Sequence, residues 1–158
     1  MLIAVFAVLV SFSTLFVYVY QSNLMKQQQK MSVWPHLSYG PSWGTDYFTI
    51  NLINKGIGPA LVTSATIRDG DTDLDGTHSL MSLVPDSLKV SFSYSSVFPG
   101  QVLMAGEELR LFHITEPGTV QYMLNLLLEN RISIQICYES VYGDSWITHG
   151  LFVEEADC

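Results

Sequence analysis

Basic residues are scarce in this sequence. The chain has 7 Lys and Arg against 15 Asp and Glu. All fifteen acidic residues follow Met31, where only five basic residues remain, so this part has a net charge of −10. Such a charge repels the phosphates of nucleic acids and the headgroups of anionic lipids. It excludes nucleic acid as a partner and favours solubility, a cationic partner or a metal ion.

Cysteine is almost absent. Two cysteines, Cys137 and Cys158, cannot form a disulfide framework. A bridge between them would require the tail to fold back, so we expect free thiols, which agrees with a reducing compartment. Alternation within the surrounding segment places Cys137 on the solvent face, and no basic residue stands near it in sequence. We therefore expect an inert thiol.

The usual catalytic motifs are also missing. The segment 56–58 lacks the lysine of a phosphate-binding loop, and no Gly-x-Ser-x-Gly motif is present. The adjacent pairs Glu107–Glu108 and Glu154–Glu155 would point to opposite faces of a strand. None of the histidines has metal-site spacing: His36, His78, His113 and His149. We expect no enzyme, the remaining alternative being one whose residues meet only in the fold.

The most informative feature present is an apolar run. Residues 2–20 are nineteen consecutive positions without a charge, a proline or a glycine. As a helix this run spans roughly the 30 Å of a bilayer's hydrocarbon core. Tyr18 and Tyr20 suit the membrane interface. We expect a transmembrane anchor over residues 1–21 in the cell inner membrane, with a cleaved signal peptide or a buried core helix as the alternatives.

Residues 22–35 are predicted to continue the helix as a juxtamembrane stalk. The segment is rich in Gln, and Trp34-Pro35 would end the helix. Lys26 and Lys30 lie close to the apolar run, so the positive-inside rule leans toward a cytoplasmic C-terminal domain. An exported domain stays open as the alternative.

From His36 onward the apolar period changes to two. Leu88–Phe98 is the clearest expected strand, because apolar residues alternate there with Lys and Ser. A helix is expected from Pro117 to Asn130. Further strands are expected at residues 36–39, closed by Gly40-Pro41, and at 46–54, 61–67, 109–114, 132–139 and 146–153.

The predicted fold class is mainly β. We expect an antiparallel, immunoglobulin-like β-sandwich with one short helix over residues 36–153, and a frayed acidic tail over 154–158. A small closed barrel is the second choice.

Several segments resemble a family. The anchor, the stalk ending in SVWPHL (32–37), the segment NKGIGPA (54–60) and the segment CYESVYGDSW (137–146) are similar to those of uncharacterised small bacterial membrane-anchored β-sandwich proteins. The resemblance implies this architecture and a bacterial inner-membrane setting. It implies no activity and no functional residues.

An acidic segment, 69–76, is the strongest local sign of a ligand. Asp71, Asp73, Asp75 and Gly76 match positions of a calcium loop at which alternate carboxylates converge. Ser82 stands where such a loop has a bidentate Glu. Asp71, Asp73 and Asp75 are therefore candidate calcium ligands, and a solvated turn between strands is the alternative.

The remaining candidate contact is aromatic. Trp43 lies in a Gly-Pro-Ser-Trp-Gly segment and is expected to be exposed, whereas Trp146 is expected in the core. The function predicted is a membrane-tethered, non-catalytic β-sandwich interaction module for an unknown protein partner, using loop ends or an exposed sheet edge. The alternative is a ligand- or calcium-sensing domain that uses the segment 69–76.

Overall fold

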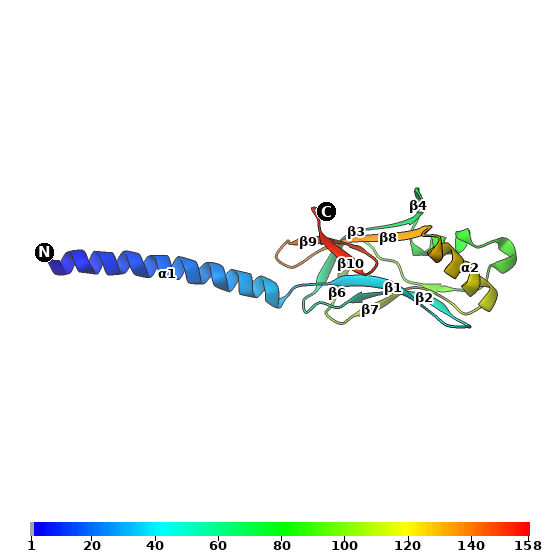
Figure 1. The fold of residues 1–158 in the computed structure, drawn as a ribbon, viewed down its shortest axis with the longest axis horizontal. Coiled ribbons are helices and arrows are strands. Elements are labelled where there is room, and N and C mark those ends of the chain that lie inside the picture. Colours follow the sequence, from blue (N-terminus) through cyan, green and yellow to red (C-terminus); the bar gives the residue numbers. More distant parts are fainter. Residues whose placement is uncertain (1) are drawn as a thin grey trace. The chain divides into compact units, whose positions relative to one another are not determined.

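The computed structural model describes residues 2–158, which divide after Val33 into two compact units. The first unit is the helix α1 (Leu2–Ser32). The second unit, Trp34–Cys158, is mainly β and is called the β domain below (Figure 1). The expected helix and the expected antiparallel β region are both present.

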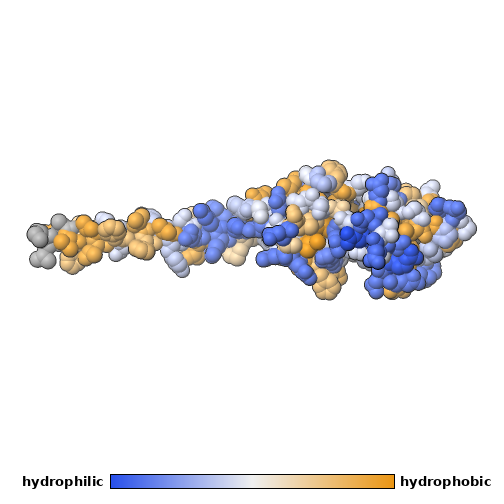
Figure 2. Space-filling view, turned by 90° about the horizontal axis from the view of Figure 1, so that it is seen from above, coloured by the Kyte–Doolittle hydropathy of each residue, from blue (hydrophilic) through white to orange (hydrophobic). Residues whose placement is uncertain are grey.

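Helix α1 is long and apolar enough to cross a membrane. No part of its apolar stretch is buried, and Phe16, for example, is 77% exposed. Figure 2 shows the helix changing from hydrophobic to hydrophilic along its length. The helix runs on without a break to Ser32, just before Trp34-Pro35. None of the described residues of α1 belongs to the hydrophobic core of the β domain.

The β domain contains two antiparallel sheets. Sheet A has the strand order β1-β2-β7-β5, and sheet B has the order β10-β9-β8-β3-β4, with β6 also paired to β3. The strands of sheet A are β1 (Leu37–Trp43), β2 (Phe48–Asn54), β7 (Glu108–Ile114) and β5 (Ser93–Tyr94). Those of sheet B are β10 (Phe152–Glu155), β9 (Ser145–His149), β8 (Ile132–Glu139), β3 (Ala60–Asp69), β4 (Thr72–Leu74) and β6 (Val102–Leu103).

Both sheets contribute to one hydrophobic core. Phe48 and Phe112 of sheet A are fully buried, as are Ile136 and Tyr138 of sheet B. Trp146 stacks on Tyr138 and is buried, as expected. Helix α2 (Pro117–Leu128) adds the buried side chains Val120, Met123 and Leu126. The burial of alternate strand residues is the period-2 pattern of the sequence.

A buried amide holds one end of the β domain together. Asn54, the last residue of β2, donates from Nδ2 to the carbonyl oxygens of Gly58 at 2.8 Å and Leu103 at 3.0 Å. Its Oδ1 accepts from the backbone N–H groups of Gly56 at 3.0 Å and His36 at 3.2 Å. The beginning of β1, the β2–β3 turn and β6 therefore share one side chain, which leaves none of its polar atoms unsatisfied.

Three local predictions are wrong. Gly40-Pro41 lies inside β1 and does not end it. The helix expected at residue 117 is present, but two 3₁₀ helices, η1 (Thr77–Leu83) and η2 (Asp86–Leu88), were not expected. The expected strand at residues 146–153 is two strands, because Gly150, with φ 69°, begins a two-residue turn between β9 and β10.

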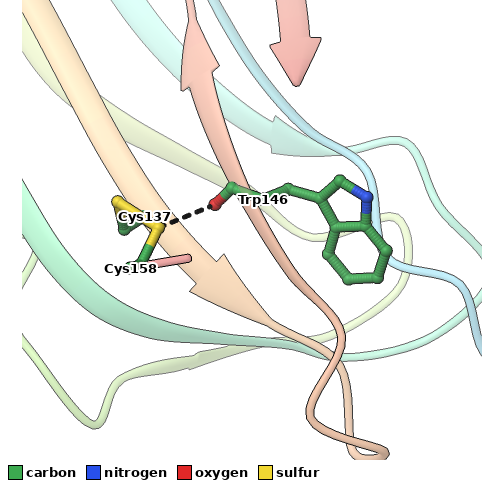
Figure 3. The surroundings of a disulfide bond; sticks show 3 residues. All are labelled: Cys137, Trp146 and Cys158. Atoms are coloured by element: carbon green, nitrogen blue, oxygen red, sulfur yellow. Dashed lines mark hydrogen bonds between the residues drawn. A yellow bond between two sulfur atoms is a disulfide. The ribbon is translucent and has the colours of Figure 1, made fainter. Parts of the chain in front are cut away.

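The prediction of free thiols is wrong, as is that of a frayed tail. Cys137 and Cys158 form a disulfide, with their Cα atoms 5.9 Å apart (Figure 3). Glu154 and Glu155 belong to β10. The tail folds back because the turn at Gly150 reverses the chain, which brings Cys158 to β8. Cys137 does lie on the face of β8 opposite the core, as its alternation predicted.

Candidate functional site

One edge of sheet A is incomplete. β5 pairs with β7 only through Ser93 with His113 and Tyr94 with Phe112. One further backbone bond joins the N–H of Ser95 to the carbonyl of Leu111 at 3.2 Å. On the side of β7 that faces β5, no strand among residues 2–158 lies beside Glu108–Arg110. We call Glu108–Arg110 the open edge, since unpaired strand edges are templates for another strand.

A groove lies along the open edge. It has a volume of about 480 Å³ and is lined by residues of both strands: Ser93, Tyr94, Ser95, Glu108 and Arg110. Its size falls within the range of small-ligand sites, roughly 300–1,000 Å³. Hydroxyl and charged groups line it, so it suits a polar segment of extended chain.

The open edge exists because the segment after β5 leaves sheet A. Before β5, the carbonyl oxygen of Leu88 accepts a hydrogen bond from the Thr119 hydroxyl of α2 at 2.5 Å. After β5, the backbone N–H of Gly100 donates to the carbonyl of Val62 in sheet B at 2.8 Å. A chain that must cross between the sheets cannot also pair along the whole of β7. The prediction of a continuous strand over Leu88–Phe98 is therefore wrong.

Aromatic contacts hold the short β5 in position. Phe92 lies 5.5 Å from Phe112 of the core and 5.6 Å from Tyr94, between ring centroids. Tyr94 lies 5.8 Å from His78 of η1 and is 49% exposed. This series of rings leads from the core to the surface. Side-chain packing thus compensates for a strand with only two paired residues.

The open edge carries two exposed charges of opposite sign. Glu108 and Arg110 are two residues apart, so they lie on the same outward face of β7, while Leu109 between them packs against the core. Neither charged side chain has an ion-pair or hydrogen-bond partner within residues 2–158. Both are therefore available to a partner.

The structure does not bring the candidate calcium ligands together. β3 and β4 form a hairpin with a tight turn at residues 69–72. In this hairpin Asp73 lies directly opposite Arg68, and the Arg68 Nε atom lies 2.6 Å from the Asp73 Oδ1 atom. Asp69 is bound by Arg131 at 2.6 Å, and this hydrogen bond raises the pKa of the arginine. Within the described part of the chain, no three His, Cys, Asp or Glu side chains are grouped to hold a metal ion. Of the three candidate ligands, Asp73 is therefore balanced by Arg68, while Asp71 and Asp75 are exposed.

Trp43 is exposed as expected, but it lies in a strand. It is the last residue of β1, pairs with Phe48 and is 53% exposed. β1 and β5 are at opposite edges of sheet A. Trp43 therefore does not contribute to the groove at the open edge.

No known protein family, curated protein or solved structure matches this chain.

Proposed function

We propose that this chain is a single-pass membrane protein that presents an immunoglobulin-like β domain as a non-catalytic binding module. The observation that carries the proposal is the open edge of sheet A. An extended segment of a partner adds beside Glu108–Arg110 and takes up the backbone groups that β5 leaves unpaired. The groove along this edge receives its side chains.

The membrane assignment is supported by the surface of α1. Its apolar side chains are exposed along the whole stretch of residues 5–20. An apolar surface of this extent is unfavourable in water and favourable in lipid. Anchoring by α1 keeps the β domain at the surface of the bilayer, which raises its effective concentration for a partner on the same membrane.

The disulfide supports a location of the β domain outside the cytoplasm. Disulfides persist in oxidising compartments, whereas cytosolic thiols are kept reduced. Lys26 and Lys30 favour the opposite side under the positive-inside rule. We give more weight to the Cys137–Cys158 bond because it is part of the folded domain. The calcium-sensing alternative is not carried forward, since Arg68 binds the candidate ligand Asp73 and the described residues contain no group of three potential metal ligands.

The proposal is tested by cross-linking at the open edge. The full chain is produced in membranes with the photoreactive residue benzoylphenylalanine in place of Ser93, which lines the groove. The matched control has it in place of Ser42, an exposed serine of β1 at the other edge of the same sheet. We expect a cross-linked product from position 93 and not from position 42. No product from position 93, or equal products from both, would overturn the proposal.

A further inference from the structure

We propose that the partner at the open edge is a second copy of this chain, an inference that rests on the function proposed above. Two copies meet with their β7 strands antiparallel, and a two-fold axis passes beside Leu109. The contact is isologous, because the same three residues of both chains form it, and it closes as a dimer.

The charges of the open edge are complementary to themselves. In an antiparallel pair centred on Leu109, Glu108 of each copy lies opposite Arg110 of the other. Two ion pairs of opposite charge therefore form across the axis, and such cross-strand pairs are stabilising. A pair centred one residue earlier would place Glu108 opposite Glu108, and like charges directly opposite are destabilising. The sequence of the edge thus selects both the partner and the register.

The free charges agree with this arrangement. Glu108 and Arg110 are the charged residues that line the groove, and neither forms an ion pair with the described residues, 2–158, of its own chain. Forming the dimer therefore breaks no existing ion pair. Leu109 stays packed against the core of its own domain.

The contact is short, so it depends on the membrane. β5 pairs with β7 from Phe112 onward and the backbone N–H of Ser95 bonds to Leu111, which confines the pairing of the two copies to Glu108–Arg110. Each β domain also has a net charge of −10, and two such domains repel each other. Confinement of both copies to one bilayer by α1 raises their effective concentration and allows a weak contact to form.

Charge-swap variants of the full chain test the inference. The chain is reconstituted in phosphatidylcholine vesicles, and association is measured by energy transfer between donor- and acceptor-labelled copies. Glu108→Arg and Arg110→Glu each give residues 108 and 110 the same charge, so two pairs of like charges lie opposite one another across the two-fold axis. We expect either change to weaken association at least about fourfold, since each variant loses two cross-strand pairs of about 0.2–1 kcal/mol and gains two repulsions of similar size. The double variant E108R/R110E restores opposite charges across the axis, so we expect it to associate as the unmodified chain does.

The control is Glu155→Arg, which makes the same charge change at an exposed position of β10 and should leave association unchanged. Thermal melting of each variant checks that the domain is folded. Absence of association in the unmodified chain, persistence of it in both single variants, or failure of the double variant to recover would each overturn the inference. If position 93 cross-links to a different protein, this inference fails alone. If position 93 gives no product, the proposed function fails with it.

Discussion

Cys158 reaches across β9 to form its disulfide with Cys137 of β8. Cys137 pairs with Ile147 in β9, and the Sγ atom of Cys158 lies 3.5 Å from the backbone carbonyl oxygen of Trp146 in the same strand (Figure 3). The bond therefore joins the third strand from the edge of sheet B to the tail beyond the edge strand, β10. The disulfide is therefore a covalent link that spans β9 and β10 of sheet B.

Removal of this disulfide should destabilise the β domain substantially. The bond joins residues 21 positions apart, and closing such a loop lowers the entropy of the unfolded chain. We expect the double variant C137S/C158S to lose about 3 kcal/mol of unfolding free energy, measured by urea denaturation. The unmodified chain after reduction should lose a similar amount. Unchanged midpoints in both samples would show that the bond adds no stability.

Asn54 should be the most sensitive polar residue of the core. Asn54→Ala removes four hydrogen bonds and leaves buried backbone groups without partners. We expect a loss of about 3 kcal/mol or more in unfolding free energy, at roughly 1–3 kcal/mol for each unsatisfied group. The matched control is Asn51→Ala in the same strand, where the amide accepts one bond from Thr49 and the residue is half-buried. Similar losses in both variants would contradict the role of Asn54.

Stability should fall at high pH because of buried tyrosines. Burial raises the pKa of Tyr138 to about 12, and it also raises the pKa of Tyr39. Both phenols are protonated below pH 10 in the folded and the unfolded chain, so their contribution is fully present there. Above about pH 10 the unfolded chain loses these protons first, so unfolding free energy falls by up to about 1.4 kcal/mol per pH unit for each tyrosine. Tyr138→Phe should give a smaller slope between pH 10 and 12 in urea titrations, and an unchanged slope would exclude this cause.

Calcium should not stabilise the β domain. Asp69 and Asp73 are bound by arginines, so their charges are already balanced. We expect the melting temperature to change by less than about 1 °C in millimolar calcium, the range in which extracellular calcium modules bind. Magnesium serves as the control ion. A rise of several degrees specific to calcium would restore the calcium-sensing function.

The alternation of apolar residues predicted most of the strands, because each buries one face. β2, β3, β7 and β8 all lie where the period of two placed them. The alternation did not predict the structure of Leu88–Phe98 correctly. Alternation shows which side chains face the core, but it does not show which strand lies alongside. Val90 and Phe92 do pack against the core, yet the chain leaves sheet A after Tyr94. Because alternation carries no information on strand pairing, the open edge could not be predicted from the sequence.

The disulfide was missed because one turn was missed. Residues 146–153 were treated as a single strand, which carried the tail away from β8. Gly150 followed by Leu151 is a two-residue hairpin turn, and glycine is favoured there by the positive φ. Recognising it would have returned the chain along β9 and brought Cys158 toward Cys137. The side of the membrane on which the β domain lies would then have been inferred from a disulfide, which favours an oxidising compartment.

The most direct test of the central claim is the redox state and accessibility of the two cysteines in cells. The full chain is treated in intact cells, with the inner membrane closed, first with a membrane-impermeant reductant and then with a membrane-impermeant maleimide of high mass. An anchored β domain outside the cytoplasm should gain two labels, only after reduction, and without rupture of the membrane. Labelling without reduction, or only after lysis, would contradict this location and the inference that the disulfide marks it.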